Sequence, residues 1–294
     1  MELNTTLITT PPRPAATVVM LRDGPVGLEV FLLKRHGNSE VLGGAYVFPG
    51  GKVDAADAGL APLLTQPVSA LQEALGEPEL DAPAVIGFYG AALREAFEES
   101  GVLFSTAVSA AQLQHAQAQV RAGQPFAAVM HALSLQLDTG GVLPWSRWIT
   151  PRLASVSTQR FDTRFFVAAV PPDQIARHDN HETTDSVWLP PRTALRLYWD
   201  DQIALAPPQI LSLAHLARHT QVASVLQEAR GRRPPCILPE PFEHEGQRVI
   251  CYPGDERHSV QARALPGPTR LHYRHRRFEP WDGFEGLFND PAAP

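Results

Sequence analysis

Three glutamates in one short stretch are the strongest chemical signal in this chain of 294 residues. The stretch reads REAFEESGV over residues 94–102. At about 100° per residue, Glu95, Glu98 and Glu99 fall on one face of a helix. Carboxylates this close repel one another unless a cation neutralises them, and by spacing Arg94 reaches only Glu98. We therefore expect a divalent cation, Mg²⁺ or Mn²⁺, among these oxygens, with a solvated acidic helix surface as the alternative.

A glycine turn precedes this stretch by about forty residues. Residues 48–57 read FPGGKVDAAD, and Pro49, Gly50 and Gly51 predict a tight turn after an apolar strand. Glycine also lets the backbone approach a ligand closely. Taken alone, such a turn says little about function.

Together, the turn and the acidic stretch resemble the signature of the Nudix hydrolase superfamily. That signature has a Gly, five residues, a Glu, seven residues, and then Arg-Glu-aliphatic-any-Glu-Glu-any-Gly-aliphatic. Gly51 matches the first glycine, and residues 94–102 match the second half. This chain departs from it in three ways: Asp57 replaces the first Glu, Ala96 stands at the aliphatic position, and residues 58–93 replace the usual seven.

One branch of the superfamily, which resembles acyl-coenzyme A diphosphatases, carries a similarly interrupted signature. The resemblance implies an α/β fold, a Nudix-type α/β/α sandwich with a mixed sheet. We expect one domain over residues 1–233, with a helical insertion in the box at 58–90 and a helical segment at 107–140. Residues 234–294 are expected to form a C-terminal extension that packs on the same domain. Such an insertion costs little closure entropy if its ends stay together.

Hydrophobic periodicity predicts the main elements. A hairpin is expected around Asp23-Gly24, and the acidic helix is expected to begin well before Arg94, because apolar periodicity resumes at Val85. The expected strands are 16–22, 28–35, 144–151 and 160–170, and the expected further helices are 68–75, 110–121, 126–137 and 208–229.

The resemblance also assigns roles to the acidic residues. Glu98, Glu99, Glu95 and the backbone at Gly51 are implied as metal ligands, and Arg94 is implied to orient Glu98. A diphosphate is polyanionic, so bound cations both hold it and neutralise charge on the leaving phosphate.

The attacking water needs a base. By resemblance, Glu95 is the first candidate for the carboxylate that deprotonates this water. Glu182, in a loop before a Trp-containing strand with Asp185 behind it, is the second candidate. Loop solubility is the alternative for Glu182.

Candidate substrate contacts come from two segments. The segment that contains Arg35 and Phe48 resembles the stretch that precedes the box in coenzyme A diphosphatases. Arg160 and Arg164 alternate with apolar residues along residues 160–170, and arginine offers a rigid donor fork for phosphates or for a carbonyl-rich substrate tail. A solvated sheet face is the alternative.

Charge, cysteine spacing and hydropathy argue against several classes of protein. A formal net charge of −6 argues against a binder of duplex nucleic acid. Cys236 and Cys251 lack zinc-like spacing, no apolar run is long enough to span a membrane, and no signal peptide or peroxisomal address is recognisable. We expect a cytoplasmic protein without membrane partners, and a homodimer stays open.

These observations leave three functional hypotheses. The first is hydrolysis of the diphosphate linkage of coenzyme A or acyl-coenzyme A to a phosphopantetheine product and an adenosine bisphosphate. The second keeps the Nudix pyrophosphohydrolase chemistry but acts on a dinucleotide or a nucleotide sugar. The third is a sensor that binds a nucleotide without turnover, against which the intact set Glu95, Glu98 and Glu99 argues.

Overall fold

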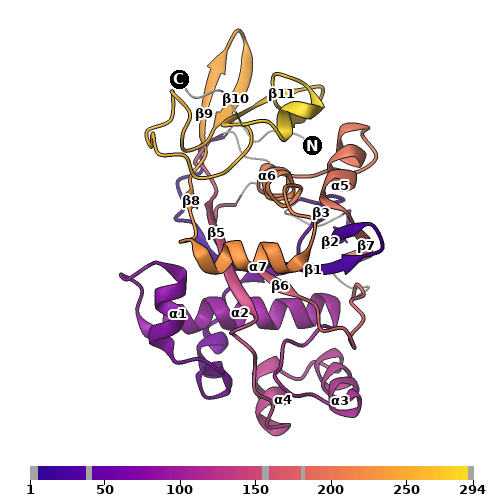
Figure 1. Ribbon diagram of the computed structural model, residues 1–294. Helices are drawn as coiled ribbons and strands as arrows, with labels where there is room; N and C mark the ends of the chain where they lie inside the picture. The colour runs from indigo at the N-terminus through magenta and orange to yellow at the C-terminus, as the bar shows by residue number, and fades with distance from the viewer. Residues whose placement is uncertain (1–5, 38–41, 154–158, 180–182, 291–294) are drawn as a thin grey trace.

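A mixed β-sheet forms the centre of the molecule, as the computed structural model shows for residues 6–37, 42–153, 159–179 and 183–290 (Figure 1). Its strands are β1 (Arg13–Gly24), β2 (Gly27–Arg35), β3 (Tyr46–Val47), β4 (Gly50–Lys52), β5 (Val142–Ile149), β6 (Phe161–Ala169), β7 (Thr183–Leu189) and β8 (Cys236–Ile237). The order is β3-β2-β1-β6-β5-β8, with β4 paired to β1 and β7 to β2. β1 with β6 and β5 with β8 are parallel, and the other pairs are antiparallel, which confirms the expected mixed sheet.

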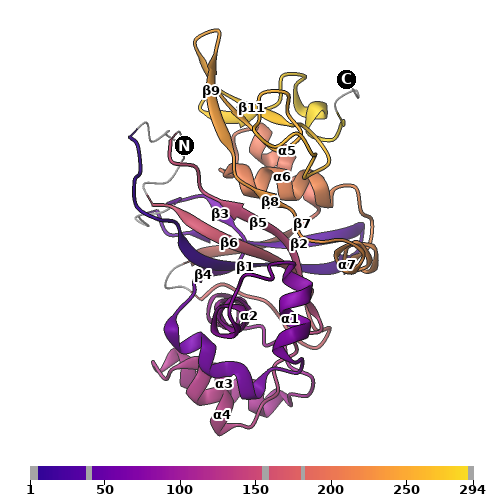
Figure 2. The same ribbon diagram turned by 90° about the vertical axis from the view of Figure 1, so that its left-hand side faces the viewer.

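Helices cover both faces of this sheet (Figure 2). One face carries η1 (Ala55–Leu63), α1 (Val68–Leu75), α2 (Ala82–Ser100), α3 (Ala110–Arg121) and α4 (Phe126–Ala132), and the other carries α5 (Pro191–Trp199), α6 (Pro207–Leu216) and α7 (Val222–Gly231). Alternation along β1 separates the two cores, because Val18 and Met20 point to one face and Val19 and Leu21 to the other. The α/β/α sandwich is confirmed.

The hairpin of β1 and β2 also forms as expected, with its turn slightly displaced. Gly24 pairs with Gly27, so Pro25 and Val26 make the turn instead of Asp23-Gly24.

α2 holds the acidic stretch, and local sequence sets both of its ends. The Asp81 side chain accepts a hydrogen bond from Ala84 N at 2.9 Å, which caps the first turn. Gly101 ends the helix with φ of 74°. η1 packs closely on α2 at Gly90, where a Cβ would lie 2.7 Å from the Asp57 carbonyl oxygen. The absence of that Cβ lets η1 carry Asp57 to the acidic turn of α2.

The single helix expected over 208–229 is wrong, because the chain breaks between α6 and α7. In the break, Thr220 O accepts a hydrogen bond from Leu28 N at 2.9 Å, and Asp23 Oδ1 accepts one from Val222 N at 2.8 Å. These bonds fasten the break to the β1–β2 hairpin and replace helical hydrogen bonds there. The expected helix 126–137 likewise ends early, at Ala132, since Leu137 N donates to Leu63 O instead.

The C-terminal residues contribute to both sheets. β8 joins the central sheet, and a second antiparallel sheet contains β9 (Glu240–His244), β10 (Gln247–Cys251), β11 (Arg270–Arg274) and β12 (Arg277–Glu279), followed by η2 (Phe284–Leu287). Tyr252, Leu271 and Phe278 of this region share the core of α5 to α7. Among the described residues, no helix has the length and apolar character required to cross a bilayer.

Candidate active site

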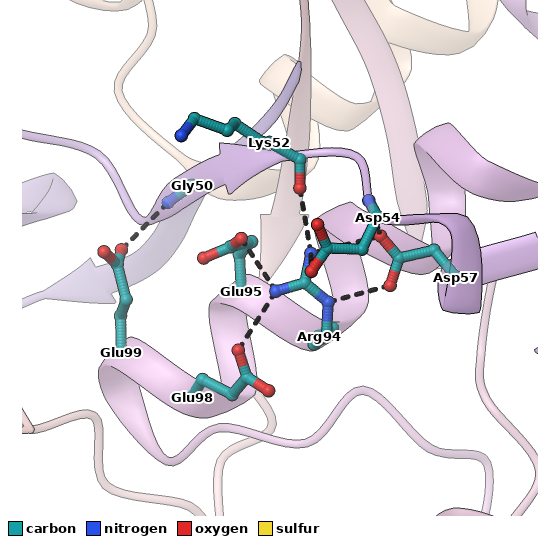
Figure 3. A network of polar contacts seen from close by, with 8 residues as sticks. All are labelled: Gly50, Lys52, Asp54, Asp57, Arg94, Glu95, Glu98 and Glu99. Carbon is teal, nitrogen blue, oxygen red and sulfur yellow. Dashed lines mark hydrogen bonds and ion pairs between the residues drawn. The ribbon is translucent and has the colours of Figure 1, made fainter. Parts of the chain in front are cut away.

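The glycine turn lies directly against the acidic turn of α2 (Figure 3). Glu99, which is buried, accepts a hydrogen bond from Gly50 N at 2.9 Å. A Cβ at Gly51 would lie 2.3 Å from Glu95 Oε1, so only glycine leaves room for that carboxylate. The two halves of the interrupted pattern therefore meet in space despite the residues between them.

Arg94 joins the carboxylates of this site (Figure 3). Its Nη1 lies 2.8 Å from Glu95 Oε1 and 3.0 Å from Glu98 Oε2, and its Nε lies 2.7 Å from Asp57 Oδ1. Nη2 donates to the Lys52 carbonyl at 2.9 Å. The expectation that Arg94 reaches only Glu98 is therefore wrong. Helix spacing considers only contacts within one helix, whereas the guanidinium group of Arg94 also contacts Asp57 of η1.

Negative charge exceeds positive charge here. Asp54, 3.7 Å from Arg94, adds to Asp57, Glu95 and Glu98, so four carboxylates contact one guanidinium, and Glu99 adds a fifth carboxylate beside Gly50. Burial raises the pKa of Glu98, and the charges of Asp57 and Asp54 raise it further, whereas Arg94 lowers it. An excess of carboxylate oxygens is the donor set that suits Mg²⁺ or Mn²⁺.

The glutamate oxygens face different partners. Arg94 Nη1 contacts Glu95 and Glu98, while Glu99 points to Gly50. No three ligand oxygens of these acids lie within 4.8 Å of one another among the described residues. One-third of the Glu98 side chain is exposed, so it has room to change rotamer.

A polar cavity of about 350 Å³ opens beside Glu98. Arg121, Arg177 and Asp179 line it, and among the described residues neither arginine side chain forms an ion pair or hydrogen bond. Arg177 N donates to Ser100 O at 3.0 Å, which brings its segment to the end of α2. Glu182, the second candidate base, lies outside the described residues.

Comparison with known families identifies the chain. A family model described as the NUDT19 Nudix domain matches residues 61–216, which is more than half of the chain. The chain belongs to the NUDT19 Nudix family. The matched span includes all of α2 but begins after the glycine turn.

Named relatives agree with this Nudix assignment. The chain is 26% identical over 245 residues to acyl-coenzyme A diphosphatase NUDT19 of Gallus gallus, covering 68% of this chain and 64% of that protein. It is 27% identical over 259 residues to the Homo sapiens protein of the same name, covering 75% and 69%. The chain thus spans less than two thirds of the chicken relative. The crystal structure of a NUDIX hydrolase from Alicyclobacillus acidocaldarius superposes with a TM-score of 0.61 and 27% identity, covering 77% of this chain and 98% of that one.

The arginines expected to contact substrate lie elsewhere in this Nudix domain. Arg164 is buried, its Nε donates to Glu77 Oε1 at 2.9 Å, and its Nη1 lies 3.0 Å from Asp162 Oδ2. Arg160 donates to the carbonyls of Thr150 and Thr10. The strand face that carries Arg164 is therefore not solvated. It binds Glu77 of the insertion to the sheet.

The remaining predicted residues have other partners than the acidic turn among the described residues. Phe48 is buried on the face opposite α2, with its ring edge-on to Phe165 at 6.4 Å. Arg35 ends β2, where it pairs with Thr183 of β7. Asp185 accepts a hydrogen bond from Tyr46 at 3.1 Å, and burial together with Asp185 raises the pKa of Tyr46 to about 12.

An apolar cavity of about 170 Å³ lies on the opposite face of the sheet. Phe161 and Phe165 line it, so the apolar face of β6, rather than its polar face, borders a hollow. Thr17, which pairs with Gly50 across β1 and β4, also lines it. Gln209 Oε1 is buried in this wall with no hydrogen-bond partner among the described residues.

Several residues of the site lacked a sequence signal. Arg121 and Arg177 are ordinary surface arginines by pattern, and only the packing of their segments on the end of α2 brings them to Glu98. Gln209 lies in the first turn of α6, within the expected helix 208–229, for which no functional role was predicted. Asp54 did have a signal, since it is three residues before Asp57 in the acidic loop.

Proposed function

We propose that this chain is a divalent-cation-dependent hydrolase that cleaves the diphosphate linkage of coenzyme A or an acyl-coenzyme A. The observation that carries the proposal is the contact of Glu95 and Glu99 with the glycine turn, in a site where carboxylates outnumber cations. The NUDT19 relatives, which are named acyl-coenzyme A diphosphatases, support the substrate class.

Residues of the α2 turn would hold the cation. Glu98 and Glu99 supply carboxylate oxygens, the Gly51 backbone lies beside them, and Arg94 fixes the orientation of Glu98. When bound, Mg²⁺ or Mn²⁺ neutralises charge on the diphosphate and on the leaving phosphate.

Glu95 is the proposed base. It is mostly buried, and Arg94 and Gly51 fix its carboxylate from two sides. A fixed carboxylate next to the diphosphate orients the attacking water and accepts its proton. Glu182 remains the second candidate for this role.

The two cavities suit the two ends of such a substrate. Arg121 and Arg177, which have no side-chain partner among the described residues, provide cations beside Glu98 for the phosphates of the nucleotide end. Thr17, which pairs with Gly50, is one of the residues that line the apolar cavity, and this cavity can take an apolar chain. The Gln209 side-chain carbonyl, without a partner among the described residues, suits an amide N–H of the pantetheine arm.

Product analysis tests the proposal. The full chain with millimolar Mg²⁺ or Mn²⁺ is given coenzyme A, acyl-coenzyme A of increasing chain length, a dinucleotide and a nucleotide sugar. We expect a phosphopantetheine product and an adenosine bisphosphate, with a higher kcat/KM for acyl-coenzyme A than for coenzyme A. Cleavage of only the dinucleotide or nucleotide sugar would overturn the substrate, and binding without turnover would overturn the enzymatic role.

A further inference from the structure

Two histidines and a glutamate meet on the face of the sheet opposite the acidic turn. His215 Nε2 of α6 lies 2.8 Å from Glu228 Oε1 of α7, and His219 Nε2 lies 2.9 Å from Glu228 Oε2. Among the described residues, this is the only His, Cys, Asp or Glu trio whose ligand atoms all lie within 4.8 Å of one another. We call these three residues the histidine site.

Hydrogen bonds around His219 place a proton on its Nδ1. The Ser224 hydroxyl donates its single hydrogen to Gln221 O at 2.8 Å, so it accepts at 2.9 Å from His219 Nδ1. A neutral His219 protonated at Nδ1 then directs the Nε2 lone pair at a carboxylate oxygen of Glu228. Two lone pairs at 2.9 Å repel, so a positive charge must lie between them, either a proton or a metal ion.

The other two members are directed at one another. His215 is buried, and its Nε2 contacts Glu228 Oε1 at 2.8 Å. Its Nδ1 has no hydrogen-bond partner among the described residues, so Nε2 is the ring nitrogen that faces the other two members. Neutral imidazole and ionised carboxylate are the forms that bind metals.

We propose that His215, His219 and Glu228 bind a transition-metal ion, with Zn²⁺ as the best match. Two imidazole nitrogens and one carboxylate oxygen are a zinc donor set. Bonds of about 2.0–2.1 Å at tetrahedral angles separate ligand atoms by about 3.3 Å, and the three ligand atoms already lie within 4.8 Å of one another. Glu228 is 31% exposed, which gives the ion an entry path and a water molecule as fourth ligand.

The surroundings of the site hold its ligands in place. Ser224 fixes the ring of His219, and Arg232 donates to Glu228 Oε1 at 2.8 Å and to Trp145 O at 3.0 Å. Trp145 of β5 packs on His215 with ring centres 4.6 Å apart. A metal here connects α6 to α7 across their break and fixes both helices over the sheet (Figure 1).

Zinc titration of the chelator-treated full chain tests the site. Calorimetry in excess Mg²⁺, without substrate, keeps the measurement independent of the proposed hydrolase activity. We expect one equivalent of Zn²⁺ to bind and to raise the unfolding temperature. Co²⁺ should give the visible absorption typical of tetrahedral coordination in the unmodified chain, which requires no variant to fold.

The zinc affinities of substituted chains distinguish a metal site from three residues that are joined only by hydrogen bonds. Ser224→Ala should weaken zinc binding about 10–100-fold, because it releases the ring of a ligand. His219→Gln and Glu228→Gln should weaken it more, and His115→Gln, at an exposed position of α3, should leave it unchanged.

Two results would overturn the proposal. One is the absence of zinc binding, together with an NMR titration showing His219 doubly protonated at pH 7. The other is zinc binding that is equal in the unmodified chain, in His219→Gln and in Glu228→Gln.

Discussion

Two candidate cation sites lie on opposite faces of one sheet, and their donor atoms differ. The acidic turn of α2 offers only oxygens, from Glu95, Glu98 and Glu99. The histidine site between α6 and α7 offers two nitrogens and one carboxylate. Oxygen donors suit Mg²⁺ and Mn²⁺, whereas imidazole suits Zn²⁺. We therefore expect the two sites to prefer different ions.

Each site has an arginine beside it, and the two sites differ in the negative charge that remains after pairing with that arginine. At α2, Arg94 is shared among several carboxylates, so a negative excess remains. At the histidine site, Arg232 already pairs with Glu228, the single carboxylate of the trio. We expect the first site to attract a hydrated cation that also binds a polyanion. We expect the second to bind only an ion that bonds strongly to nitrogen.

Removal of the proposed base should have the largest effect. Glu95→Gln is expected to lower kcat for diphosphate hydrolysis about 10²–10⁴-fold, because the attacking water loses its proton acceptor. Zinc binding at the histidine site should not change. Glu73→Gln, at an exposed position of α1, is the matched control in the same steady-state assay. An unaltered rate in Glu95→Gln would move the base to another residue, with Glu182 next.

Displacement of the same carboxylate should have a smaller effect. Gly51→Ala places a methyl group 2.3 Å from Glu95 Oε1, which forces the side chain to move. We expect kcat to fall about 10–100-fold with the fold and the zinc affinity intact, because small displacements of a catalytic group are costly. Gly59→Ala, where a Cβ meets no atom within 4 Å, should be neutral. Equal kcat values for Gly51→Ala and Gly59→Ala would show that the glycine turn does not position the catalytic carboxylate.

The polar cavity should contribute binding rather than chemistry. Arg177→Gln is expected to raise KM about tenfold with little change in kcat, which corresponds to one lost charge-assisted hydrogen bond of about 1.5 kcal/mol. Arg230→Gln, at an exposed position of α7 near the histidine site, is the control. A KM that stays at the unmodified value in Arg177→Gln would remove this arginine from the substrate site.

The smallest expected effect is on stability without metal. Because the pKa of Glu98 is raised in the folded chain, the folded state binds more protons than the unfolded state between the two pKa values. Its contribution to stability therefore falls as pH rises through that interval. Glu98→Gln should raise the unfolding temperature of the chelator-treated chain by about 1–2 °C at pH 7, and the difference should vanish below the ordinary glutamate pKa.

Thermal unfolding at pH 7 and at a pH below the ordinary glutamate pKa checks this prediction, with Glu73→Gln as the control. Destabilisation by Glu98→Gln at pH 7 would show that its pair with Arg94 outweighs burial.

The contrast between the sites also shows what the sequence can predict. The acidic turn is contiguous and periodic, so its helix and shared face follow from spacing alone. Its contact with the glycine turn needed the family resemblance, because the two segments are separated by residues 58–93. The contacts of Arg94 with Asp57 were not predictable from helix spacing, since they depend on how η1 packs at Gly90.

The histidine site was not predicted, for a related reason. His215 and His219 have i,i+4 spacing, which was a usable signal, but Glu228 meets them only because the helix breaks between α6 and α7. That break depends on bonds to Asp23 and Leu28, far away in the sequence. Likewise, strand alternation gave the two faces of β6 but not which face borders a cavity.

Manganese binding tests the central claim most directly, that the acidic turn of α2 holds a divalent cation. Free Mn²⁺ is measured by its paramagnetic resonance signal during titration of the unmodified chain, Glu98→Gln and His219→Gln. We predict that the unmodified chain and His219→Gln bind Mn²⁺ equally well and that Glu98→Gln binds it at least about tenfold more weakly, because it loses one charged oxygen ligand. Equal Mn²⁺ binding by Glu98→Gln and the unmodified chain would contradict the account.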